Sequence, residues 1–285
     1  MNATGVATAF TRGPARRAMT HILLLGFGFA YLYPFLWAVG SSLKSKLDFL
    51  DSGLGLLPPA PRWENYAEAW QEASFGTYFM NTLFISVISV FLTLLFTAMA
   101  GFALARTAFP GKKIVIGVIM VTFLLPHGYT IIPVFDLVNA LGLLNTLWSV
   151  ILVQVGGGLV FGTFMFMAYF ATMPRELEEA ARVDGAGFNT LFFRVMLPLS
   201  KPMAATLGLF TFISSWNNFF LPLVFTLGKP ELRTVGVGLY AFTNQTTTNW
   251  TLLCAGAIIS LAPIVIVFVV AQRYIVEAIA GAVKA

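Results

Sequence analysis

The sequence predicts an all-α integral membrane protein with six transmembrane helices, and three observations support that fold class. The chain has 285 residues, of which 58% are hydrophobic and only 10% charged. Soluble domains average roughly 25% charged residues, so a mean hydropathy of +0.83 excludes a soluble globular enzyme and a disordered chain. Six stretches without Asp, Glu, Lys or Arg are each at least 22 residues long, and a spanning helix needs about 20 apolar residues. The apolar runs are continuous and do not alternate, which argues against a transmembrane β-barrel.

These stretches place the helices in order along the chain. We expect spans at 20–42, 78–105, 114–136, 146–171, 203–226 and 252–274. The first follows a basic segment but is longer than the apolar core of a signal peptide, roughly 7–15 residues, so we expect an uncleaved span. The expected division is an N-terminal tail 1–19, a first span 20–42, an outer loop 43–77, a core of five spans 78–274 with an inner loop 173–202, and a C-terminal tail 275–285.

The distribution of basic residues predicts the orientation in the membrane. With the N-terminus inside, 12 Lys and Arg residues fall in inner segments and 5 in outer segments, out of 17. Because cytoplasmic loops carry the excess of Lys and Arg, both termini are expected in the cytoplasm. The same bias explains the net charge of +5, so no nucleic-acid partner is needed to account for it.

Residue types that carry chemistry are scarce. One cysteine, Cys254, and two histidines, His21 and His127, argue against a disulfide framework and an all-protein metal site. The sequence contains no phosphate-binding loop and no serine- or zinc-hydrolase motif. We therefore expect no catalytic residue, no metal and no cofactor on this chain. The spans hold essentially no ionisable residue, which argues against coupling to an ion gradient.

The most charged segment is the loop between the fourth and fifth expected spans. Pro174 suits the first position of a helix, and acidic residues after it complement the helix dipole. Gly185 is a natural C-terminal stop, so a short helix is expected over 174–184. Two adjacent alanines make one face of this helix flat enough for a partner's backbone to approach closely. By helical spacing the members of that face are Leu177, Ala180, Ala181 and Asp184.

The spacing beyond this helix resembles the EAA loop of ABC-importer permeases. That pattern reads Glu-Ala-Ala-x3-Gly-x9-Ile-x-Leu-Pro, and here it runs from Glu179 to Pro198 with Val195 in place of Ile. Nearly the whole chain resembles the sugar permeases of the maltose-transporter type, specifically their shorter, six-span subunit. Further matching segments are Arg62–Tyr66, Ala103–Arg106, Phe109–Lys112, Trp216–Phe219 and Gln272–Val276.

The resemblance implies the fold of a type I ABC importer permease, in the cytoplasmic membrane of a bacterium. It also implies four partners: a second, homologous permease subunit, two copies of a cytoplasmic ATPase that hold ATP and magnesium, an extracytoplasmic sugar-binding protein, and the sugar itself. On this basis Glu179 is expected to make a charge contact to the ATPase, and Ala180 and Ala181 to form the docking face. Gly185 is expected to make the turn, and Asp184 to stabilise the loop.

The expected substrate path is less sharply defined by the sequence. Trp216, Asn217 and Asn218 lie within the fifth expected span and supply the aromatic face and amide groups that sugars require. Helix packing and interhelical hydrogen bonds explain the same residues equally well. Two further functional classes stay open as alternatives, a stand-alone channel or secondary carrier and, less favoured, a membrane-embedded enzyme. The candidate substrates are maltose-like sugars, trehalose, cellobiose, other oligosaccharides and glycerol phosphate.

Overall fold

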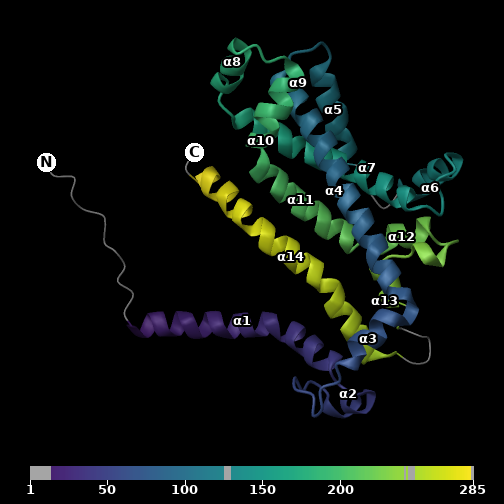
Figure 1. Ribbon diagram of the computed structural model, residues 1–285. Coiled ribbons are helices and arrows are strands. Elements are labelled where there is room, and N and C mark those ends of the chain that lie inside the picture. Colours follow the sequence, from purple (N-terminus) through teal and green to yellow (C-terminus); the bar gives the residue numbers. More distant parts are fainter. Residues whose placement is uncertain (1–13, 125–129, 241, 243–247, 284–285) are drawn as a thin grey trace.

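The structure is a computed structural model that describes residues 14–124, 130–240, 242 and 248–283, and its helices are joined by short connections (Figure 1). The long helices are α1 (Pro14–Ser42), α4 (Phe75–Arg106), α7 (Leu147–Thr172), α11 (Lys201–Trp216) and α14 (Trp250–Val283). The shorter elements are α2 (Lys46–Ser52), α3 (Glu64–Gln71), η1 (Glu72–Ser74), α5 (Lys112–Phe123), α6 (Ile131–Ala140), α8 (Glu176–Val183), α9 (Phe188–Thr190), the π-helix η3 (Leu191–Met196), α10 (Leu197–Leu199), α12 (Phe220–Phe225), η4 (Pro230–Leu232) and α13 (Val235–Tyr240).

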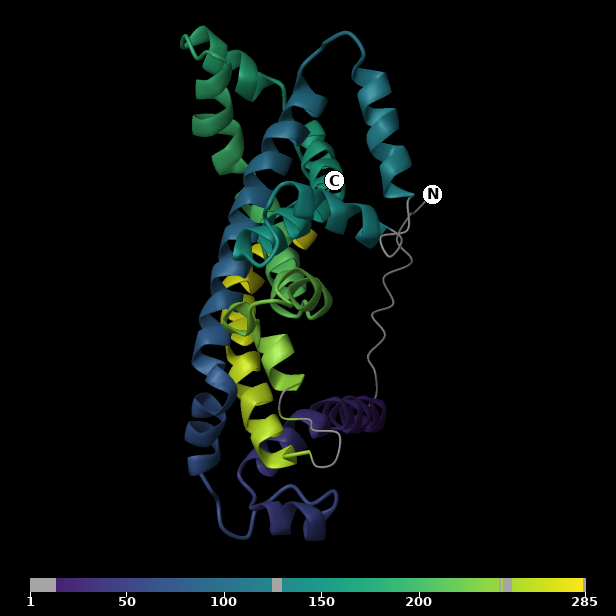
Figure 2. The same cartoon turned by 90° about the vertical axis from the view of Figure 1, so that its right-hand side faces the viewer.

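Four of these helices contain segments long and apolar enough to cross a membrane. They are Ala18–Ser42, Phe75–Arg106, Leu147–Thr172 and Trp250–Arg273. A fifth crossing is possible if Phe188–Leu199 and Lys201–Trp216, which meet at an angle of 73°, are counted as one bent span. Figure 2 shows α8 and the turn between α4 and α5 at one end of the molecule, and α2 and α3 at the other. The expected inner segments that carry α8 and the α4–α5 turn therefore lie at the end of the molecule opposite to the expected outer loop 43–77.

The third expected span, 114–136, is not one continuous helix. It consists of α5, which ends at Phe123, and α6, which begins at Ile131. Pro126 and His127 fall between them, outside the described residues. A proline lacks an N–H group and disfavours the helical conformation of the residue before it, so a helix ends readily just before one.

The fifth expected span, 203–226, is also interrupted. Helix α11 ends at Trp216, and α12 begins only at Phe220. The Asn218 side chain accepts a hydrogen bond from the Leu221 N–H at 3.1 Å, which caps the new helix. Pro222 has no N–H to donate to the Asn218 carbonyl, so a continuous helix would lose a bond at this point.

The segments expected as tails and outer loop also contain helix. Helix α1 begins at Pro14, inside the expected tail 1–19, and α14 continues to Val283, through most of the expected tail 275–285. The expected outer loop 43–77 contains α2, α3 and the first turn of α4. The apolar stretches expected at 20–42, 78–105 and 252–274 lie within longer helices, so the helices extend beyond them.

The centre of the fold is the close contact between α4 and α7. A methyl group added at Gly101 would lie 2.6 Å from Cβ of Phe166, and one added at Gly162 would lie 2.7 Å from Cγ2 of Thr97. A methyl group added at Gly158 would lie 3.4 Å from Cγ2 of Thr93, so Gly158 also faces α4, on the same side of α7 as Gly162. Around this contact, α4, α7, η3 and α11 bury an apolar cluster that includes Phe102, Phe166, Phe170 and Phe192.

The opposite end of the bundle is closed by a hydrogen-bonded cap. The Asn65 amide donates to the carbonyls of Ser42 at 2.8 Å and Lys44 at 2.9 Å. The hydroxyls of Tyr66 and Ser42 lie 2.7 Å apart, and the buried Lys44 ammonium donates to the carbonyl of Gly55. Asn65 and Tyr66 thus hold α3 to the end of α1, which gives two residues of the segment 62–66 a structural role.

Substitution of Gly101 by alanine tests the α4–α7 contact. The new methyl group would meet both a side-chain carbon and the backbone nitrogen of Met167, at 2.8 Å, so one helix must move. We expect Gly101→Ala to reduce stability by about 1–3 kcal/mol and to lower the unfolding temperature of the purified protein in detergent. Gly156→Ala is the matched control, because its methyl group enters open space. A Gly101→Ala protein as stable as Gly156→Ala would contradict the packing described.

Candidate functional site

Helix α8 is the first candidate site, and its C-terminal end follows the expected pattern. Gly185 has a φ of +83°, which favours glycine. Its N–H donates to the Arg182 carbonyl at 3.0 Å, and the Ala186 N–H donates to the Ala181 carbonyl at 2.9 Å. These two bonds form a Schellman motif, so Gly185 ends the helix as predicted. The start differs by two residues, because α8 begins at Glu176.

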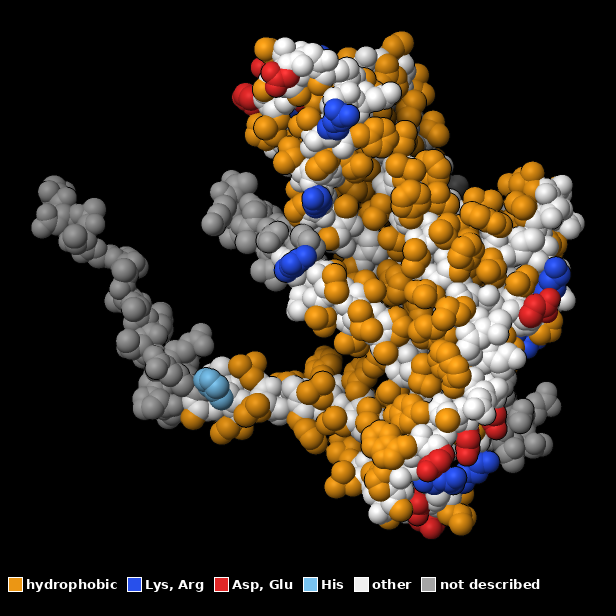
Figure 3. Space-filling model, in the orientation of Figure 1, with side chains coloured by type: hydrophobic (Ala, Val, Ile, Leu, Met, Phe, Trp, Pro, Cys, Tyr) orange, Lys and Arg blue, Asp and Glu red, His pale blue; other side chains and the backbone are white. Residues whose placement is uncertain are grey.

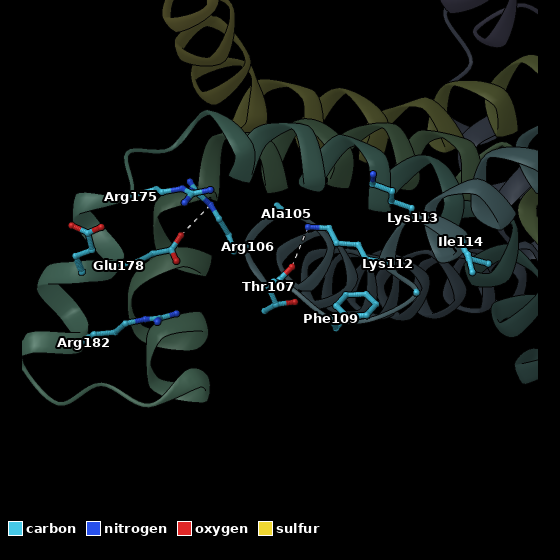
Figure 4. Close-up of a pocket in the computed structure, with 13 residues that line it drawn as sticks. Ala105, Arg106, Thr107, Phe109, Lys112, Lys113, Ile114, Arg175, Glu178 and Arg182 are labelled. Carbon is cyan, nitrogen blue, oxygen red and sulfur yellow. Dashed lines mark hydrogen bonds and ion pairs between the residues drawn. The ribbon is translucent and has the colours of Figure 1, made fainter.

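The inner side of α8 is held by a buried ion pair. Nε of Arg106, the last residue of α4, lies 3.1 Å from Oε1 of Glu178, and the two side chains are only 7% and 11% exposed. The same guanidinium donates to the carbonyls of Phe170 and Met173, at the C-terminal end of α7. Figure 4 shows Arg106 and Glu178 joined across the space between α4 and α8. We call this arrangement the Arg106–Glu178 joint.

The joint connects three helices through one charged group. Arg106 interacts with the last carbonyls of α7, where the helix dipole is negative, and with a carboxylate of α8. Loss of one partner from a buried ion pair leaves an uncompensated charge and is strongly destabilising. Helix α8 is therefore attached to the ends of both α4 and α7. Glu178 is not among the residues predicted from the sequence, because it has the same local signal as the adjacent Glu179.

Of the four residues predicted from spacing to share one face of α8, Leu177, Ala180 and Asp184 are exposed, and Ala181 is the exception. Ala181 is half-buried and packs against the apolar cluster of the bundle, so it faces this chain's own core. Ala180, Glu179 and Asp184 are exposed. Val183 is 88% exposed, which makes it an apolar side chain on the outer surface. The surface available to a partner is centred on Ala180 and Val183, and Ala181 does not belong to it.

A cavity of about 400 Å³ between α7 and the end of α11 is the second candidate site. The amide nitrogen and oxygen of Gln154 and the hydroxyl of Ser215 are buried without a hydrogen-bond partner among the described residues. Buried polar groups normally have partners, so these atoms mark a place where a polar molecule can bind. The cavity is lined by Val153, Gln154, Gly157, Gly158, Phe161, Leu207, Phe210, Thr211, Ser214, Ser215, Asn218 and Leu221.

Of the three residues expected in the substrate path, only one lines this cavity. Asn218 lines it, whereas Asn217 is exposed and is not part of its wall. Trp216 is buried, and its indole N–H donates to the Ser260 carbonyl at 2.9 Å while its ring stacks on Phe212. Its position corresponds to the packing alternative. Gln154 lines the cavity but was not predicted from the sequence. It could have been found as an amide inside an otherwise apolar span, where polar side chains tend to be functional.

The described residues contain no group of three His, Cys, Asp or Glu side chains placed to hold a metal ion. On the face drawn in Figure 3, hydrophobic side chains cover most of the middle of the bundle, and charged side chains lie near α8, near α2 and α3, and at the right edge beside α12. Charged side chains are therefore available to partners at the two ends of the molecule, whereas the cavity offers uncharged amide and hydroxyl groups.

Comparison with known proteins identifies the relatives of this chain. Residues 97–281 match the family described as binding-protein-dependent transport system inner membrane components. The chain is 35% identical to the diacetylchitobiose uptake system permease protein of Streptomyces coelicolor, over 90% of this chain and 85% of that protein. It is 33% identical to the arabinooligosaccharides transport system permease protein of Halalkalibacterium halodurans, over 92% and 96% of the two chains.

Solved structures show the same similarity in three dimensions. The chain aligns with a TM-score of 0.80 and 26% identity to a chain of a bacterial ABC transporter involved in the import of the acidic polysaccharide alginate. That alignment covers 93% of this chain and 99% of the other. The all-helical fold predicted from the sequence is therefore confirmed as that of a type I ABC importer permease.

The Arg106–Glu178 joint is tested by removing its carboxylate. We expect Glu178→Ala to destabilise the protein by roughly 3 kcal/mol and to speed amide hydrogen exchange in residues 176–183, because α8 loses its inner attachment. Glu179→Ala removes a neighbouring but exposed carboxylate and should leave both measurements near wild type. Equal effects of the two substitutions would show that α8 is not held by this ion pair.

Proposed function

The chain belongs to the family of binding-protein-dependent transport system inner membrane components and is a multi-pass permease of an ABC importer, and from that premise we propose a two-site mechanism for it. Helix α8 is the docking site of a separate ATPase, and the cavity between α7 and α11 is part of the path of an uncharged oligosaccharide. The observation that carries the proposal is the exposed helix α8, fixed on its inner side to α4 and α7 by the Arg106–Glu178 joint.

Docking uses the outer side of α8, on the cytoplasmic side of the membrane. Ala180 allows a partner's backbone to approach closely, and Val183 offers it an apolar contact. Glu179 and Asp184 are exposed beside them and supply negative charge. ATP and magnesium belong to the ATPase in this mechanism, and this chain carries out no hydrolysis.

The joint transmits movement from the docked ATPase to the membrane. Arg106 is the last residue of α4, and its side chain binds the end of α7 and Glu178 of α8. A displacement of α8 therefore moves these helices together. Helix α7 carries Gln154 in the wall of the cavity, and α11 carries most of the opposite wall. A shift of α7 relative to α11 therefore changes access to the cavity. ATP binding biases this equilibrium by favouring one of the two arrangements.

The substrate is an uncharged oligosaccharide in this proposal. The cavity is lined by amide and hydroxyl groups and by the rings of Phe161 and Phe210, without a charged side chain. This chemistry suits neutral sugars, which combine hydroxyl groups with apolar ring faces. Two of the relatives named above are uptake or transport permeases for diacetylchitobiose and arabinooligosaccharides, whereas the alginate transporter imports an acidic polysaccharide. The uncharged wall of the cavity favours the neutral class for this chain.

Two further partners complete the proposed importer. The exposed cap around α2 and α3, at the end opposite α8, is the contact for an extracytoplasmic sugar-binding protein. Helix α1 is the contact for a second, homologous permease: it projects from the bundle (Figure 1), packs mainly on α14, and none of its apolar window is buried. Two permease chains and two ATPase copies would then form one transporter.

The docking proposal is tested at Ala180. Ala180→Leu keeps helix propensity nearly unchanged while adding bulk to the outer surface, so we expect at least a tenfold loss of ATP-driven sugar uptake and loss of the co-purifying ATPase. Gly185→Val should act similarly, because a β-branched residue at a φ of +83° is strained. Ala171→Leu, at an exposed position in α7, is the matched control. Normal uptake by the Ala180→Leu, Gly185→Val double variant would refute docking at α8.

The cavity is tested by removing hydrogen-bonding groups with little change in volume. Each of Gln154→Leu and Thr211→Val should lower the apparent affinity of uptake by roughly 3- to 10-fold, the effect of one lost hydrogen bond, while the complex still assembles. Gln272→Leu, on an exposed part of α14, is the control. If the control reduces uptake as much as the cavity variants do, the sugar does not pass along this wall.

A further inference from the structure

A second and larger cavity, of about 810 Å³, lies between α8 and the turn that joins α4 to α5. We call it the α8–α5 cavity. Figure 4 shows its walls: Arg175 and Arg182 come from the side of α8, whereas Phe109 and Lys112 come from the α4–α5 turn. We propose that this cavity binds the phosphate group of an anionic phospholipid, whose acyl chains lie along α5.

The wall of the α8–α5 cavity carries a net positive charge. Arg106 and Glu178 neutralise each other in the joint, and Glu179 is the one other carboxylate of the wall. Against it stand four cations that form no ion pair within the described residues: Lys112, Lys113, Arg175 and Arg182. Cations from two separate elements that face one cavity repel each other, and an anion placed between them relieves that repulsion.

The N-terminus of α5 adds the positive end of a helix dipole to the same cavity. This helix has 12 residues, and its N-cap is Gly111, which has no side chain to accept a bond from the first N–H groups. The first turn contains no acidic residue either, so nothing in the sequence compensates the positive end of the helix dipole. The Lys112 ammonium donates to the Thr107 carbonyl at 3.0 Å, which holds it at the turn. A helix N-terminus beside lysines is a favourable place for phosphate.

An exposed apolar face of α5 continues from the cavity and favours a lipid over a free phosphate ion. Ile114 lines the α8–α5 cavity, and Val118 and Val121 follow it on the same face of α5. All three are exposed. Val121 in turn lines a groove of about 340 Å³ between α5 and α7, whose wall contains only apolar side chains: Met120, Val121, Phe123, Leu124, Phe161 and Phe164. A phospholipid offers both a phosphate for the cavity and acyl chains for this face, whereas a phosphate ion offers only the former.

The lipid site lies next to the proposed ATPase contact on α8, and Glu179 is the one residue that the two share. The cavity side of α8 consists of Arg175 before its first turn, and Glu178, Glu179 and Arg182 on the helix. The docking surface is centred on Ala180 and Val183, which do not line the cavity. A bound phosphate therefore links α8 to the start of α5, next to the Arg106–Glu178 joint. Basic pockets between membrane helices are known to bind acidic headgroups.

The test measures lipid binding to the purified protein, with whatever subunits co-purify, in nanodiscs of phosphatidylcholine that contain phosphatidylglycerol. Native mass spectrometry counts the lipids retained after detergent release. We expect wild-type protein to retain phosphatidylglycerol in preference to phosphatidylcholine, and Lys112→Gln with Lys113→Gln to weaken this retention about tenfold or more, as expected for two lysines near an anionic headgroup. Arg194→Gln with Lys201→Gln is the matched control, because it removes two exposed cations of the same region outside the cavity.

Several outcomes would overturn the proposal. Equal losses in the cavity and control variants would show a diffuse attraction of the basic end to acidic lipid. Displacement of phosphatidylglycerol by millimolar inorganic phosphate would assign the cavity to a free ion, and absence of any preference in the wild-type protein would remove the site altogether. Should the double variant unfold, Lys113→Gln alone replaces it, because Lys113 makes no side-chain hydrogen bond or ion pair among the described residues. Its retention should fall several-fold.

Discussion

An arginine buried near the ends of two helices must find acceptors, because its guanidinium does not lose its charge. The guanidinium of Arg106 donates to the last carbonyls of α7 and forms an ion pair with the carboxylate of Glu178. The ion pair places α8 beside the ends of α4 and α7. The position of Glu178 in turn directs Ala181 inward and leaves Ala180 and Val183 outside. The surface at which we propose that an ATPase docks is thus the side of α8 that this buried ion pair leaves exposed.

Close packing of α4 against α7 lets the two helices move together when the attached helix α8 moves. Gly101 and Gly162 let the helices approach so closely that even a methyl group would collide. Two helices packed in this way move as one body, because interiors at such density do not deform gradually. The joint at their ends and the glycine contact along their length therefore act together. Between them they connect α8 to Gln154, which lies on α7 in the wall of the cavity.

The interruption of the fifth span has a complementary role. Backbone groups inside a membrane must be paired, so an irregular segment is stable only where protein or a polar cavity surrounds it. The break after Trp216 occurs beside the cavity, and the Asn218 side chain both caps α12 and lines the cavity wall. Trp216 anchors the end of α11 through its bond to Ser260 and its stacking on Phe212. Trp216 secures the end of α11, while Asn218 faces the cavity.

The sequence by itself determined the properties that depend on local composition and backbone conformation. Charge-free stretches located the apolar helices, Gly185 marked the end of α8 because its φ is positive, and the spacing from Glu179 to Pro198 indicated the family. Only the tertiary structure distinguished Glu178 from Glu179, since neighbouring acids on a short helix have the same local signal but face different surroundings. It likewise assigned Trp216 to packing and Gln154 to the cavity, because burial depends on helices far apart in the chain.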